Sequence, residues 1–99
     1  MRTLLRINLD VVASNKAVND GTLQKTIEST MQKLKPEAAY FFTDQGNRAC
    51  LMVFDLTDSS QIPPTLEPFF MNLNAKVDLC PVMNAEDLQK GLAMWMKSK

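Results

Sequence analysis

Two strand-like runs around one short polar turn lie at the centre of the chain and constrain its fold more than any other feature. Residues 38–43 (AAYFFT) and 48–55 (RACLMVFD) are rich in aromatic and aliphatic side chains, and the turn between them reads DQGN. Two such runs separated by a turn with glycine are typical of a β-hairpin. The turn length predicts that Thr43 pairs with Arg48.

The rest of the chain predicts two further strands and three helices. Alternating apolar and polar residues indicate strands, and apolar residues three to four positions apart indicate helices. Pro81 favours an edge position for the last strand, because proline cannot donate a ladder hydrogen bond. In chain order the flanking elements are a strand at 2–10, a loop at 11–21, a helix at 22–35, a proline-broken helical segment at 58–73, a strand at 75–83 and a helix at 85–97 that begins after Asn84.

This order of elements predicts one domain over residues 1–99, of the α+β class. Strand, helix, strand, strand, helix, strand is the ferredoxin-like βαββαβ plan, here with an added C-terminal helix. Right-handed crossovers place both long helices on one face of a four-stranded antiparallel sheet. The expected strand order is 4-1-3-2.

Both faces of this sheet are apolar, which predicts a partner for the face without helices. In the third strand, Ala49, Leu51 and Val53 alternate with Cys50, Met52 and Phe54. Isolated monomers rarely expose a large contiguous apolar patch. Two-fold homodimers are the commonest soluble oligomers, so we expect the open sheet face to pair with a second copy of the chain.

The element order, with the fourth strand running into a helix through residues 80–86 (CPVMNAE), resembles the dimeric α/β-barrel superfamily. That superfamily includes muconolactone isomerases, cofactor-free monooxygenases and many short bacterial proteins. The resemblance implies two ferredoxin-like sheets packed face to face. It also implies a small-molecule-binding or regulatory module, with a cofactor-free monooxygenase-like or isomerase-like enzyme as the alternative. A purely structural or interaction protein is a third reading.

Composition argues against several classes of function. Eleven basic and eleven acidic residues give a formal net charge of zero, and there is no histidine. A neutral chain has no overall field for nucleic acid or anionic lipid. The third strand also lacks the stacking aromatics of an RNA-recognition domain. Without histidine or a CxxC pair, neither a metal site nor a cofactor is expected.

The candidate ligand-binding residues are Arg6, Asn8, Tyr40 and Asp78. Arg6 and Asn8 share the polar face of the first strand, which is central in the expected sheet. In a dimer interior this face could bind a small polar ligand together with Tyr40 or Asp78. The competing interpretation is that Arg6 simply pairs with a neighbouring carboxylate. No catalytic residue is predicted.

The remaining reactive residues have structural interpretations. Cys50 and Cys80 are expected to be buried, reduced thiols, without a disulfide between them because their strands lie on opposite sides of the first. Asp55 and Asp58 are explained by turn and cap chemistry. Trp95 either anchors a dimer contact or covers one end of the core. Polar residues interrupt the apolar N-terminal segment, so the expected location is the cytoplasm.

Overall fold

A four-stranded antiparallel sheet forms the centre of the computed structural model, which describes all 99 residues. Its strands lie in the order β2-β3-β1-β4. This is the predicted order 4-1-3-2 counted from the other edge, so that prediction is confirmed. The strands are β1 (Arg2–Asn8), β2 (Ala38–Asp44), β3 (Asn47–Asp55) and β4 (Lys76–Pro81), and β4 is an edge strand as Pro81 indicated.

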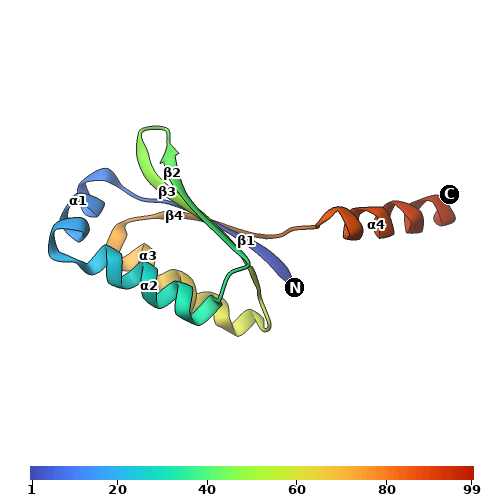
Figure 1. Ribbon diagram of the computed structural model, residues 1–99, viewed down its shortest axis with the longest axis horizontal. Coiled ribbons are helices and arrows are strands. Elements are labelled where there is room, and N and C mark those ends of the chain that lie inside the picture. Colours follow the sequence, from blue (N-terminus) through green and yellow to red (C-terminus); the bar gives the residue numbers. More distant parts are fainter.

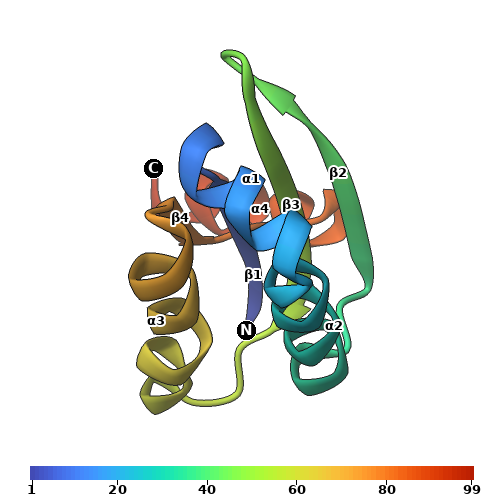
Figure 2. The ribbon, with the colours of Figure 1, turned by 90° about the vertical axis from the view of Figure 1, so that its left-hand side faces the viewer.

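Four α-helices accompany the sheet, three of them on one face. They are α1 (Val11–Asp20), α2 (Thr22–Leu34), α3 (Ile62–Leu73) and α4 (Ala85–Ser98), and a short 3₁₀ turn, η1 (Ser59–Gln61), precedes α3. Figure 1 shows α1, α2 and α3 on the same side of the sheet, with α4 extending away from the opposite side. Figure 2 shows the same arrangement end-on, with α4 behind the strands. The molecule therefore has one helix-covered face and one open face.

The β2–β3 hairpin has the predicted register. Thr43 pairs with Arg48, and the turn is formed by Gln45 and Gly46. Both turn residues have positive φ, 52° and 80°, which is the backbone of a type I′ turn. That turn matches the twist of the strands it joins, so it fixes which side chains of the hairpin face the helices.

The core lies between the sheet and helices α1 to α3. Leu5 and Ile7 of β1 and Met52 and Phe54 of β3 point to the helix-covered face and are almost fully buried. Across the two central strands, Leu5 pairs with Met52 and Ile7 pairs with Cys50, which is also buried. Leu9, just after β1, also belongs to the core cluster, and the helices contribute Ala17, Leu23, Leu66, Phe69 and Leu73.

Helix α1 corrects the sequence prediction, which placed a loop at residues 11–21. The side chain of Asp10 caps the helix by accepting a hydrogen bond from the Ala13 amide at 2.9 Å. Ser14 and Ala17 are buried against the core. The asparagines and serine of this segment have weak helix propensity, but packing of one face on the core overrides it.

Side-chain hydrogen bonds lie at the start of three other helical segments. Those of Asn84 and Asp58 are N-caps, whereas Asp20 lies just before Gly21, the N-cap residue of α2. The carboxylate of Asp20 accepts hydrogen bonds from the Thr22 hydroxyl and amide, at 2.6 and 2.9 Å, and these bonds lower the pKa of Asp20. Asn84 accepts from the Asp87 amide at 2.8 Å at the start of α4. Asp58 caps η1, so its predicted turn role is confirmed.

The proline-broken segment at 58–73 resolves into η1 followed by α3. Pro63 and Pro64 occupy the first turn of α3, where the missing amides cost nothing. Pro68 lies inside the helix. Its nitrogen carries no hydrogen, so it cannot donate the usual helical bond to the carbonyl of Pro64, four residues earlier.

Helix α4 stands apart from the rest of the fold. Every one of its residues is exposed, and the molecule is 55 Å long with a radius of gyration of 16.0 Å. A compact chain of this length has a radius of gyration of about 13 Å. Trp95 is 61% exposed, so the reading in which it covers the end of the core is wrong.

Candidate functional site

The open face of the sheet combines an apolar surface with a polar corner. Strand pairing aligns Tyr40, Leu51, Arg6 and Asp78 in one row that crosses all four strands. The next row toward the hairpin turn contains Asn8, Ala49 and Phe42. On the other side of the first row, the open face is apolar and is formed by Ala38, Val53, Leu4 and Cys80.

A small polar cavity lies at the hairpin end of this face. It measures about 180 Å³ and brings together residues from all four strands and the β2–β3 turn. Arg6 Nη2 lies 3.0 Å from Asp44 Oδ2. Asn8 donates to the Asp44 carbonyl at 3.3 Å and accepts from Asn47 Nδ2 at 3.0 Å. The lining residues are Arg6, Asn8, Asp44, Gln45, Asn47, Lys76 and Asp78.

Three of the four residues singled out in the sequence meet in this cavity. Arg6, Asn8 and Asp78 line it, whereas Tyr40 lies at the β2 end of the row and is exposed. Arg6 also forms the carboxylate pair of the competing interpretation, with Asp44 as its partner. Structural pairing and ligand contact are compatible here, because the pair lies at the wall of the cavity and stays partly exposed.

The sequence analysis did not single out Asp44, Asn47 or Lys76. Asp44 and Asn47 were assigned to the hairpin turn. Asp and Asn are common in turns for local backbone reasons, so their presence there did not indicate a binding role. The signal that could have found them is the register itself. With Thr43 paired to Arg48 and Ala49 paired to Asn8, Asp44 and Asn47 at the ends of the hairpin strands lie beside the end of β1.

The charges of the cavity balance, with Arg6 and Lys76 against Asp44 and Asp78. Such a site provides positively charged hydrogen-bond donors and negatively charged acceptors, but no nucleophilic thiol or hydroxyl. The Arg6 guanidinium also lies 5.3 Å from the centroid of the Phe42 ring. Cation and aromatic ring together form a surface that suits a flat or apolar group on a ligand.

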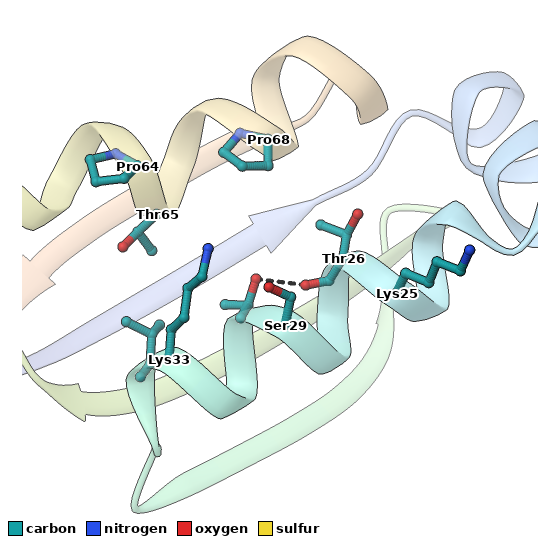
Figure 3. Close-up of a pocket in the computed structure, with 9 residues that line it drawn as sticks. Lys25, Thr26, Ser29, Lys33, Pro64, Thr65 and Pro68 are labelled. Atoms are coloured by element: carbon teal, nitrogen blue, oxygen red, sulfur yellow. Dashed lines mark hydrogen bonds between the residues drawn. The ribbon is translucent and has the colours of Figure 1, made fainter.

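A second hollow of about 210 Å³ separates α2 from α3 (Figure 3). The Lys33 side chain extends from α2 toward Thr65 of α3, whereas Lys25 points away along the helix. Thr30 donates its hydroxyl to the Thr26 carbonyl at 2.8 Å. Thr30 is buried, and its hydroxyl is already bonded to the helix backbone. This hollow is therefore a less developed site than the cavity on the sheet.

The two cysteines differ from each other, and one corrects the sequence prediction. Cys50 is buried, and burial raises the pKa of its thiol to about 11. Cys80 is exposed, because it lies on the open face of an edge strand. Both thiols are free, as expected.

No group of three metal-ligating side chains is present.

No protein-family model and no curated protein matches the chain. None of the helices has both the length and the apolar character needed to cross a bilayer. The interpretation of function therefore rests on the geometry of the open face.

Proposed function

We propose that this protein is a homodimeric module, built on the ferredoxin-like plan, that binds a small organic molecule and serves a binding or regulatory role. In this proposal the open faces of two copies pack together. The polar cavity at the hairpin end then becomes part of a shared interior. Arg6, Asn8 and Asp78 contact the ligand, and Tyr40 contributes from the edge of the same face.

The observation that carries the proposal is the coexistence of an apolar surface and a polar cavity on one open face. Leu4, Leu51 and Val53 remain partly exposed there, although they lie on the two central strands. Central strands of a small domain are normally covered on both faces or polar on one. A net charge of zero offers no repulsion to self-association.

The balanced charges of the cavity favour a ligand with both polar and apolar parts. Its polar end would exchange hydrogen bonds with the Arg6–Asp44 pair and with Asn8. Its apolar end would lie along Phe42 and Leu51, which continue the same surface on β2 and β3. Ligand sites in proteins commonly combine a mainly apolar lining with a few such polar groups.

Sedimentation at micromolar concentration tests the dimer. We expect the parent chain to sediment as a dimer, and Leu51→Lys, which places a charge in the centre of the open face, to sediment as a monomer. Asn72→Lys makes a similar change on the exposed surface of α3 and should remain dimeric. A parent chain that is monomeric would contradict the proposal.

A melting screen against small organic molecules that carry both polar and apolar parts tests the binding role. A ligand of this site should raise the melting temperature of the parent chain, since binding to the folded state stabilises it. Arg6→Gln should abolish that shift. Lys16→Gln, on the exposed surface of α1, should preserve it. Hits that stabilise the Arg6→Gln variant as strongly as the parent bind elsewhere and would speak against this site.

A further inference from the structure

An apolar groove runs between α2 and the edge strand β2, on the helix-covered side of the molecule. Ile27 and Met31 of α2 form one wall and Phe41 of β2 forms the other. The groove has a volume of about 560 Å³. Phe41 points toward the helices, because it pairs with Cys50, yet it is 54% exposed. The helices thus leave β2 incompletely covered at this edge.

Helix α4 carries a complementary stripe that also lacks a partner. Leu88, Leu92 and Trp95 recur at spacings of four and three and therefore share one side of the helix. All three are about half exposed or more. A helix of 14 residues is only marginally stable alone in water. The cap at Asn84 and the apolar stripe are both typical of a helix that packs against another surface.

The α4 of the same chain does not lie in this groove. β2 and β4 are opposite edges of the sheet, roughly 14 Å apart. Only residues 82–84 connect β4 to α4, so α4 begins close to the end of β4. Arg2 on the open face lies 3.5 Å from Asp87, so α4 begins on the open side, while α1 to α3 occupy the other side.

We propose that α4 of each protomer packs into the α2–β2 groove of its partner, so that the two copies exchange these helices. This inference rests on the dimer of the proposed function and adds a second contact to it. Leu88, Leu92 and Trp95 of one copy contact Ile27, Met31 and Phe41 of the other.

The dimensions of the two surfaces agree. From residue 88 to residue 95 the stripe rises about 10 Å, and the groove follows α2 from Gln24 to Gln32, about 12 Å. The open sheet face alone measures roughly 19 by 24 Å, or roughly 450 Å² in projection. A standard stable interface takes roughly 800 Å² from each partner, so the exchanged helices supply contact that the sheet face lacks.

Fluorescence of Trp95 tests the exchange in the full chain, because Trp95 is the only tryptophan. At concentrations where the chain is dimeric, its emission should be blue-shifted and shielded from iodide. Dilution to the monomer should remove both effects. Leu92→Lys should expose Trp95 and weaken the dimer by about tenfold or more. Ala93→Lys adds the same charge beside the stripe and should keep Trp95 shielded.

The groove is tested by a pair of variants on one strand. Phe41→Lys should expose Trp95 as Leu92→Lys does. Thr43→Lys is the control, since Thr43 points to the same face of β2 but lies outside the groove. Both positions are exposed, so neither change removes a core side chain.

Mixing two variants distinguishes exchange between chains from folding within one chain. The first chain combines Leu92→Lys with Trp95→Phe, so it has an intact groove and no tryptophan. The second chain is Phe41→Lys, with an intact α4. On mixing, Trp95 of the second chain should enter the groove of the first and become shielded again.

Four results would overturn the exchange. Trp95 could be fully accessible in a proven dimer, which refutes the exchange and leaves the proposed function standing. Shielding that persists on dilution would place α4 on its own sheet. Shielding that is kept in a Phe41→Lys dimer would place α4 outside the α2–β2 groove, for example on the partner's open face. A monomeric parent chain would refute the dimer and the exchange together.

Discussion

Arg6 on β1 reaches across β3 to two residues of β2. Its guanidinium lies 5.3 Å from the centre of the Phe42 ring and 3.0 Å from the Asp44 carboxylate. Ala49, which pairs with both Asn8 and Phe42, is the β3 residue in this part of the face and is buried. The small side chain of Ala49 leaves space above β3, across which the long side chain of Arg6 extends to β2.

Arg6→Gln should therefore change binding far more than stability. The Arg6–Asp44 pair is partly exposed, and exposed pairs contribute about 0–1 kcal/mol. We expect the free energy of unfolding, measured with urea at a fixed protein concentration, to fall by no more than that. Asp44→Asn should have a similarly small effect. A loss of several kcal/mol would mean that Arg6 supports the fold and not a binding surface.

Phe54→Ala should be strongly destabilising. Phe54 is 2% exposed in the centre of the core, and truncation of a buried phenylalanine costs about 3–5 kcal/mol. Phe70→Ala is the matched control, because Phe70 is 43% exposed on α3. Chemical denaturation of both variants gives the comparison. Equal losses at the two positions would contradict the burial described for β3.

The two cysteines should react at very different rates with a thiol reagent at pH 8. Cys80 is exposed and should be labelled first. Cys50 should stay unlabelled until the protein is unfolded, because burial shields it and raises the pKa of its thiol to about 11. At pH 8 only about one Cys50 in a thousand carries the reactive thiolate. Raising the pH toward 11 should increase its labelling.

Oxidation gives a further test of the strand order. β3 and β4 lie on opposite sides of β1, roughly 10 Å apart, and a disulfide needs Cα atoms within about 7 Å. We expect no bond between Cys50 and Cys80 in the oxidised monomer. Mass spectrometry that maps such a crosslink would contradict the sheet order.

Asn84→Ala should loosen α4 and leave the core intact. Its side chain accepts from the Asp87 amide at 2.8 Å, and loss of such a cap costs about 1 kcal/mol. We expect weaker helical circular dichroism from α4 and, in the exchanged dimer, weaker association. Asn84→Asp keeps an acceptor and should behave like the parent. The Leu51→Lys monomer provides the opposing test. If adding Asn84→Ala to this monomer lowers its denaturation midpoint, α4 supports the core of its own chain directly.

Alternation and turn spacing were enough to predict the sheet, because a register shift of one residue would turn Met52 and Phe54 out of the core. Helix α1 was missed because its signal is tertiary. Ser14 and Ala17 are buried only after β1 and α2 are in place, and short polar residues such as Asn15 otherwise favour turns. Local pattern does not contain that information.

The candidate site was predicted in part for a similar reason. Arg6, Asn8 and Asp78 could be placed on one face from strand pairing, and they line one cavity. The exposure of Cys80 was not predicted, because a cysteine in a strand with apolar side chains on both faces is expected to be buried. The chain direction after Pro81 decides which face of the sheet α4 leaves uncovered. The spacing of apolar residues in the sequence predicts the helix but not the direction in which it extends.

The two edges of the sheet differ in how they resist aggregation. β4 carries Lys76, Asp78 and Pro81, and charges and proline discourage another strand from adding there. The other edge, Ala38–Asp44, contains a run of aromatic residues with no charge before Asp44, which is the type of segment that nucleates cross-β assembly. Fibril growth from unfolded or partly assembled chains should therefore begin at β2, and a lysine at Tyr40 should delay it.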